Sequence, residues 1–206
     1  CIGMKNNFQR RTFLICCLLL SYGASLVFAG ADVLSKEDRL LFAEGLYSRR
    51  LYKQAASEYV RYLDEFPNAP NSDALLCKLG ESLRLSGDML GACQAFSKVA
   101  KQKDSKYNTE ALLKLASMLL DIDKVEDAEK FSSALINKNP PKDILAEALY
   151  LHGSALVRLS KTDAAIADFD RLIRECGSSR YIPYAKIALG SLLADPAKNQ
   201  LQRAEQ

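Results

Sequence analysis

The sequence predicts an all-α fold, an α-solenoid of about four antiparallel helix pairs followed by a single C-terminal helix. Three observations lead to this prediction. Four alanines recur at a nearly constant interval, because Ala55, Ala92, Ala128 and Ala165 are separated by 37, 36 and 37 residues. Apolar residues near each alanine follow a helical spacing, and the chain is rich in Ala, Leu, Lys and Glu with no tryptophan. A period of this length is typical of helix–turn–helix repeats.

The first 31 residues have the layout of a secretory signal peptide. A basic segment precedes an apolar stretch that extends to Phe28, and small residues follow it. We expect translation to start at Met4, downstream of residues 1–3, and cleavage to occur after Ala29 or Ala31. The alternative is that the apolar stretch, of about 17 residues, remains as a membrane anchor.

The charge of the chain changes once this leader is set aside. The whole chain has 28 basic and 25 acidic residues and a formal net charge of +3. Residues 1–29 contain three basic groups and no acidic ones, which leaves 25 of each sign in the rest of the chain. With no net charge, nucleic acid is not an expected partner. Contact with a membrane is expected only through the leader, if it is not cleaved.

Three cysteines follow the leader, and they are Cys77, Cys93 and Cys176. None belongs to a C-x-x-C pair, and an odd number does not make a closed disulfide framework. We interpret them as small apolar residues that pack between helices. A bridge between Cys77 and Cys93 in an oxidising compartment is the alternative.

One pattern recurs in each repeat, with a small residue in the first helix and an alanine followed by an aromatic residue in the second. We expect the small residues to let the two helices approach closely, and the aromatic residues to fill the space between one pair and the next. The small residues of the first helices are Ala43, Gly80, Ala116, Gly153 and Gly190; the alanines of the second helices are Ala55, Ala92, Ala128 and Ala165; the aromatic residues are Tyr59, Phe96 and Phe169, with Leu135 as the looser counterpart in the third copy.

The repeat domain is expected to cover residues 35–194, after a leader over residues 1–31. Its repeats lie near residues 37–71, 72–107, 108–143 and 144–180, with a partial one over 181–194. Turns are predicted at 86–88, 121–124 and 159–161, and prolines end two of the second helices. Ser72 is predicted to cap the helix that follows it. Residues 195–206 are expected to be a polar tail or a truncated helix.

The pattern resembles the tetratricopeptide-repeat (TPR) family over roughly residues 37–194. Residues 76–96, LCKLGESLRLSGDMLGACQAF, show it most clearly. Residues 66–83, FPNAPNSDALLCKLGESL, are similar to the P-x-S-x-x-A-x-x-x-L-G pattern of bacterial periplasmic members. Those members include the Tol-Pal-associated cell-division coordinator and the lipoprotein of the outer-membrane β-barrel assembly machinery. Cys17 lacks the lipobox of the lipoprotein, and no coiled-coil segment precedes the repeats as in the coordinator. The resemblance therefore implies an adaptor on the periplasmic side of the envelope without selecting between these roles.

The resemblance also implies where a partner binds, namely in a concave groove lined by outward positions of the first helices. This surface is mixed and rather apolar, and it suits an extended or helical peptide. The alternative is that some of these residues pack against neighbouring first helices. Leu40 and Glu44 replace the Lys and Asn of the two-carboxylate clamp that binds chaperone tails. The candidate groove residues are Leu40, Glu44, Tyr47, Cys77, Glu81, Arg84, Leu113, Ser117, Leu120, Tyr150, Ser154, Val157 and Ile187.

No sequence motif indicates catalysis, because the chain lacks an H-E-x-x-H motif, a phosphate loop and a Gly-rich dinucleotide motif. The single histidine, His152, lies at a packing position beside Gly153. We therefore predict no catalytic, cofactor-binding or metal-ligating residues, and no cofactor. The predicted function is a non-enzymatic protein–protein interaction scaffold of the cell envelope, whose partners are other envelope proteins or peptide segments. The alternatives are a self-assembling structural subunit, which would be a homo-oligomer, and a redox protein that uses its thiols.

Overall fold

The computed structural model describes residues 35–194 and contains nine helices and no strands in that range. The expected leader, the start at Met4 and the tail over residues 195–206 lie outside the described residues. None of the helices within residues 35–194 is long and apolar enough to cross a membrane. The helices are α2 (Lys36–Ser48), α3 (Tyr52–Glu65), α4 (Ser72–Leu85), α5 (Met89–Ala100), α6 (Asn108–Asp121), α7 (Val125–Ile136), α8 (Lys142–Arg158), α9 (Thr162–Glu175) and α10 (Ile182–Leu193).

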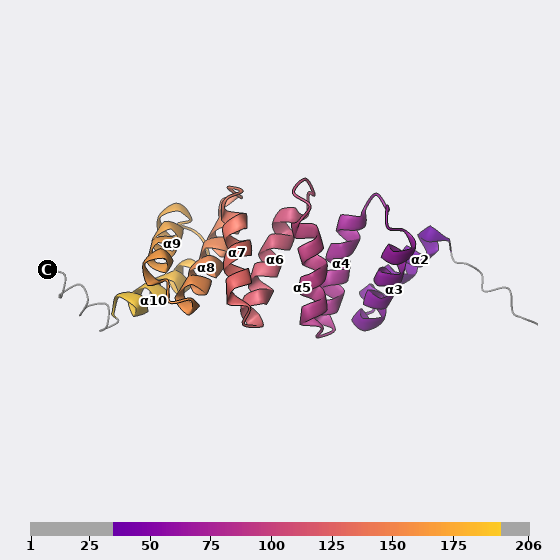
Figure 1. Ribbon diagram of the computed structural model, residues 1–206, viewed down its shortest axis with the longest axis horizontal. Coiled ribbons are helices and arrows are strands. Elements are labelled where there is room, and N and C mark those ends of the chain that lie inside the picture. Colours follow the sequence, from indigo (N-terminus) through magenta and orange to yellow (C-terminus); the bar gives the residue numbers. More distant parts are fainter. Residues whose placement is uncertain (1–34, 195–206) are drawn as a thin grey trace, which may run out of the picture. The chain divides into compact units, whose positions relative to one another are not determined.

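Each described helix packs against the next one along the chain, so that α2 to α10 follow one another in sequence order (Figure 1). The pairs are α2 with α3, α4 with α5, α6 with α7, and α8 with α9. The helices of successive pairs also touch, because α6 contacts α8. This arrangement confirms the predicted fold class, a TPR-like α-solenoid of four helix pairs and a further helix, α10.

The repeating residues of the sequence form the core of these pairs. All four repeat alanines of the second helices are buried, as are the aromatic residues Tyr59, Phe96 and Phe169. The ring of Phe96 lies on Gly80 and that of Phe169 on Gly153, so closely that a Cβ atom at either glycine would come 2.8 Å from the ring. The aromatic ring therefore packs against the first helix of its own pair. Our expectation that it also fills the space between one pair and the next stays a prediction.

The third pair departs from the pattern at its aromatic position. Counting by the repeat period from Phe96 leads to Ser132, which is fully buried and donates its hydroxyl to the carbonyl of Ala128 at 2.7 Å. Leu135, which we had matched to the aromatic position, is buried three residues later, at the equivalent of Val99. The match was wrong because the buried face of a helix includes both the fourth and the seventh residue after the alanine.

The expected cap at Ser72 was also wrong. Helix α4 begins at Ser72 itself, and the residue before it, Asn71, makes no side-chain hydrogen bond to the helix end. The backbone N–H of Ser72 already donates to the carbonyl of Ala69 at 3.0 Å, which makes this residue part of the turn into the helix. In contrast, Asp88 does cap α5, since its side chain accepts from the N–H of Gly91 at 2.9 Å.

The turn inside each pair contains one residue with positive φ. These residues are Arg50 (φ 61°), Gly87 (φ 92°), Asp123 (φ 59°) and Ser160 (φ 58°). Their separations of 37, 36 and 37 residues repeat the alanine period, so all four turns share one backbone conformation. Only one of the four is glycine, the residue that adopts this conformation without steric cost.

The first prediction concerns these turns. Gly87→Ala is expected to lower the free energy of unfolding by about 1 kcal/mol, and Ser160→Gly to raise it by up to about 1 kcal/mol, because a Cβ atom is strained at positive φ. Urea denaturation followed by circular dichroism measures both changes. Gly177→Ala is the matched control, since Gly177 is an exposed turn residue without positive φ. Equal effects at Gly87 and Gly177 would contradict the conformational explanation.

Candidate functional site

A pocket of about 440 Å³ lies across the first helices of three successive pairs. It begins at the end of α4 and the start of α5, runs along α6 and reaches the start of α8. We call it the first-helix groove. Its lining contains three carboxylates and two cations around apolar side chains. The lining residues are Arg84, Met89, Glu110, Leu113, Lys114, Ser117, Met118, Asp121 and Glu147.

Three of the residues predicted from the sequence line this groove, and they are Arg84, Leu113 and Ser117. Leu120 is only 7% exposed and offers almost no surface. Val157 and Ile187 are exposed on α8 and α10, away from the groove lining. The remaining predicted positions are partly buried, and they are Leu40, Glu44 and Tyr47 on α2, Cys77 and Glu81 on α4, and Tyr150 and Ser154 on α8. Their role in binding stays a prediction.

Ion pairs connect the first helices along the groove. Glu81 accepts hydrogen bonds from Nη2 and Nε of Arg84 at 2.6 and 3.0 Å, and its other neighbour is Nζ of Lys114 at 3.6 Å. The hydrogen bond from Arg84 lowers the pKa of the Glu81 carboxyl and raises that of the Arg84 guanidinium. Lys78 pairs with Glu44 in the same way, between α4 and α2. Of these side chains, those of Arg84 and Lys114 line the groove.

Sequence reasoning missed six of the nine groove residues, and four of these six are charged, namely Glu110, Lys114, Asp121 and Glu147. Each of these four lies on a first helix, three of them on α6 and Glu147 on α8. The spacing of the three charged residues on α6 is a signal that the sequence contains. Glu110, Lys114 and Asp121 follow one another at four and seven residues, which places them on one face of a helix. Reading charged as well as apolar residues along that face would have found them.

Tyr150 packs within the solenoid. Its ring stacks on that of Tyr181, with centroids 5.3 Å apart, and lies 6.0 Å from the ring of Tyr184. It also lies 6.2 Å from the ring of Phe169 on α9. Tyr150 therefore joins α8 to α9 and α10, which agrees with the packing alternative for this residue.

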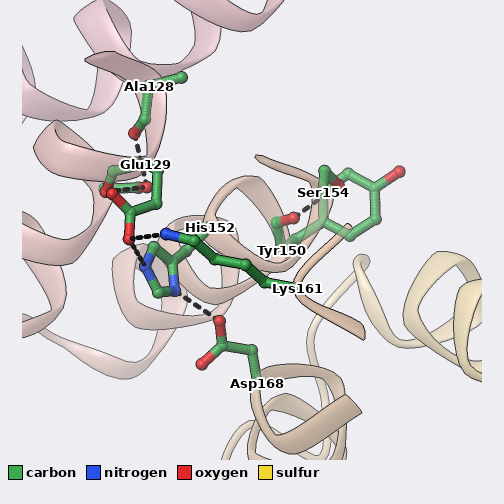
Figure 2. A network of polar contacts seen from close by, with 8 residues as sticks. Ala128, Glu129, Tyr150, His152, Ser154, Lys161 and Asp168 are labelled. Atoms are coloured by element: carbon green, nitrogen blue, oxygen red, sulfur yellow. Dashed lines mark hydrogen bonds and ion pairs between the residues drawn. The ribbon is translucent and has the colours of Figure 1, made fainter. Parts of the chain in front are cut away.

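His152 lies in a polar cluster that joins three helices (Figure 2). Its Nδ1 is 2.5 Å from Oδ2 of Asp168 on α9, and its Nε2 is 3.8 Å from Oε1 of Glu129 on α7. Lys161 reaches the same Glu129 oxygen at 3.6 Å. Only 15% of the His152 side chain is exposed. The cluster ties α7, α8 and α9 together, and it lies outside the first-helix groove.

The three cysteines of the described region are free thiols. Burial raises the pKa of all three, and for Cys77 burial together with the nearby Glu110 and Asp73 raises it to about 11. A thiol with a raised pKa is a weak nucleophile at neutral pH, because the thiolate is the reactive form. This disfavours the redox alternative and agrees with a packing role.

Among residues 35–194, no group of three or more His, Cys, Asp or Glu side chains is arranged to hold a metal ion. What the first-helix groove can do chemically is offer charged and apolar contacts to an extended segment of another polypeptide.

Comparison with known proteins identifies the repeat. Residues 147–179 match the tetratricopeptide repeat family profile. No curated protein sequence matches the chain. Solved structures do match, and one is a tetratricopeptide repeat protein from Parabacteroides merdae with a TM-score of 0.66 and 21% identity. That match covers 76% of this chain and 59% of the Parabacteroides chain.

Two further structures have the same fold. The MamA protein matches with a TM-score of 0.63 and 20% identity, over 76% of this chain and 80% of its own. YrrB, a TPR protein with an unusual peptide-binding site, matches with a TM-score of 0.60 and 17% identity, over 76% of this chain and 75% of its own. At such identities the likeness establishes the fold alone. The described helices therefore form a solenoid of the tetratricopeptide-repeat type.

Proposed function

We propose that this chain is a non-enzymatic scaffold that binds a segment of another protein in the first-helix groove, and that it works on the periplasmic side of a bacterial envelope. The observation that carries the proposal is the groove itself. It crosses α4, the start of α5, α6 and α8, and its apolar floor of Leu113, Met89 and Met118 is bordered by charged side chains. An extended peptide needs this combination, apolar contacts for affinity and charges for register.

The lining also suggests the chemistry of the partner segment. Arg84 and Lys114 already contact Glu81, and Lys114 also lies 4.0 Å from Glu110, whereas the exposed carboxylate of Asp121 has no ion pair among the described residues. We therefore expect a segment with apolar residues and at least one basic residue. The periplasmic location is supported by the signal-like leader and by the resemblance to envelope proteins. YrrB, with its peptide-binding site, is a precedent for this kind of partner on this fold.

The test is site-specific photocrosslinking in the intact cells that produce the protein. A photoreactive residue at Ser117, inside the groove, is expected to capture other envelope proteins. The matched control is the same residue at Asp170, which is exposed on α9 and outside the groove. Leu113→Asp in the groove is expected to reduce capture from Ser117, because it places a charge on the apolar floor.

Three results would each contradict part of the proposal. Equal capture from Ser117 and Asp170 would remove the groove as the binding site. Capture of cytosolic proteins alone would overturn both the envelope location and the adaptor role. Capture of only further copies of this chain would favour the alternative, a self-assembling structural subunit, and a concentration-dependent mass in solution would then confirm it.

A further inference from the structure

A separate groove of about 690 Å³ lies between the second helices α5 and α7. One wall runs along α5 from Leu90 to Lys101, just past its end, and the other along α7 from Lys124, just before its start, to Phe131. The floor comes from α6, which packs against both α5 and α7 (Figure 1). We call this surface the second-helix groove. It shares no lining residue with the first-helix groove.

Apolar side chains form the floor of this groove. They come from α6 and the turn after it, and they are Leu115, Leu119 and Ile122. Leu90 and Phe131 add apolar surface from the two walls, and Leu90 is 63% exposed. The residues at the position of Leu90 in the other second helices are all charged, and they are Lys53, Glu126 and Asp163. The repeat therefore does not need a leucine at this position, and Leu90 leaves apolar surface in water.

Positive charge borders the same groove. Its lining contains a single carboxylate, that of Asp127, and four lysines, which are Lys98, Lys101, Lys124 and Lys130. All four lysines are exposed, and within residues 35–194 none of them forms an ion pair. Nζ of Lys130 lies 5.9 Å from the centroid of the Phe131 ring, which places this charge next to the apolar wall. Like charges gathered around a cleft strengthen the electrostatic potential inside it, so the groove attracts a negative group.

The equivalent places between the other second helices lack this combination. Between α3 and α5, the charged lining residues are one lysine and one aspartate, Lys53 and Asp88. Between α7 and α9, the same place holds the polar cluster of Figure 2. The residues of that cluster that lie 36 or 37 positions after Cys93, Leu115 and Phe131 are Glu129, His152 and Asp168. Both carboxylates pair with His152 there, whereas the groove between α5 and α7 has an apolar floor and unpaired lysines.

We propose that the second-helix groove binds a segment of another protein in which acidic residues flank apolar ones. The apolar residues of the segment cover Leu90 and the floor, and its carboxylates pair with lysines on both walls. The α5 wall is about 16 Å long, which is the length of about three helical turns or of about five residues of extended chain. The first-helix groove is expected to take a segment with a basic residue, so the two grooves are expected to have different partners.

The shape and the charge of the surface favour a protein segment over other anions. A phosphate backbone or a lipid headgroup offers negative charge without an apolar side chain, whereas the floor lies between two helices and is reached by a side chain that projects into the groove. Residues 30–206 have 25 basic and 25 acidic residues, so the surface outside the groove does not attract an extended polyanion. A short acidic segment uses both features of the groove, charge for encounter and apolar contact for affinity.

The probe is a library of random peptides of about twelve residues, the length of the α5 wall, displayed and selected for binding to the full chain. We expect the selected peptides to combine acidic and apolar residues. Fluorescence anisotropy then measures their affinity for variants of the full chain. Binding is expected to weaken at least about tenfold for Lys98→Glu combined with Lys130→Glu, and to a similar extent for Leu90→Asp. Circular dichroism checks that each variant is folded.

The matched control for the charge reversal is Lys53→Glu combined with Lys186→Glu. These two lysines are exposed on α3 and α10, outside the second-helix groove, and their replacement changes the net charge by the same amount. Leu113→Asp is the control for the other site, because Leu113 lines the first-helix groove. Both controls are expected to leave the binding of the acidic peptides unchanged.

Several results would overturn the proposal. One is a selection that yields no acidic peptides, and another is an equal loss of binding in the control pair, which would show that net charge alone attracts them. If Leu113→Asp removed binding and Leu90→Asp did not, the peptides would occupy the first-helix groove instead. A single-stranded oligonucleotide or a phosphatidylglycerol vesicle whose binding needed the lysines but not Leu90 would assign the surface to a nucleic acid or a membrane. A mass that rises with concentration, and that Leu90→Asp returns to the monomer, would assign it to a second copy of the chain.

Discussion

Replacing Phe169 with alanine is expected to lower the free energy of unfolding by about 3–5 kcal/mol. The ring is 1% exposed and fills the space between α9 and the backbone of α8 at Gly153. Its removal leaves a cavity that the rigid neighbouring backbone cannot close. Because repeats of this kind are stabilised mainly by their neighbours, the C-terminal pairs are expected to unfold at lower urea concentration than the rest. Denaturation followed by circular dichroism, with hydrogen exchange of α8 and α9, measures both effects.

A double-mutant cycle with Gly153 tests the cause. Gly153→Ala alone is expected to cost about 1–3 kcal/mol, because its Cβ atom would lie 2.8 Å from the Phe169 ring. In the presence of Phe169→Ala this cost should disappear, since the new methyl group then enters the cavity. Gly190→Ala is the matched control at the equivalent position of α10, and alanine's better helix propensity should make it neutral or stabilising by up to about 1 kcal/mol. Additive changes in the free energy of unfolding for Gly153→Ala and Phe169→Ala would show that the Phe169 ring is not what disfavours a larger residue at position 153.

The fold could be predicted from the sequence because its packing contacts are local and repeat. Ala92, four residues before Phe96 and twelve after Gly80, describes the close approach within one helix pair. The same three positions recur with Ala165, and the repetition of one contact along the chain indicates a solenoid. The third pair was harder to read, because Ser132 replaces the aromatic residue there.

The groove was predicted less well than the fold, because only part of its lining lies on the face of α6 that the apolar pattern singles out. Leu113 and Ser117 of the predicted stripe line the groove, but Leu120 at the end of the stripe is buried in the core. The groove also extends over the neighbouring positions Lys114 and Asp121 of the same helix. A stripe on one helix does not reveal how far the adjacent first helices cover it, since α6 packs on both α7 and α8. That information comes only from the assembled solenoid.

Asn108 makes a buried contact that could not be predicted from the sequence. It is 2% exposed at the start of α6, and its Nδ2 donates to the carbonyls of Ala100 at 2.9 Å and Gln102 at 3.1 Å, with that of Val99 at 3.4 Å. These carbonyls belong to the last turn of α5 and the loop after it, where helix geometry leaves acceptors without partners. The equivalent positions of the neighbouring repeats are Ser72 and Leu145, so no periodic pattern indicates this contact.

Asn108→Ala is expected to destabilise the protein by about 2–3 kcal/mol, because it leaves buried carbonyls without a donor. Asn108→Asp keeps the size of the side chain but replaces the donor with a carboxylate that faces the same carbonyls, and it should destabilise the protein more than Asn108→Ala does at pH 7.

The surroundings of residue 108 set the sign of the pH dependence of Asn108→Asp. Burial among acceptors raises the folded-state pKa of the new carboxyl above its unfolded value of about 3.9. The protonated form can donate, so relative to the parent protein the variant regains stability below about pH 4 and loses it as the pH rises through the folded-state pKa. Urea denaturation from pH 3.5 to 7.5, with Asn108→Ala as the pH-independent reference, measures this difference. If the free energies of unfolding of the two variants changed in parallel with pH, Asn108 would stabilise the fold by packing and not by donating hydrogen bonds.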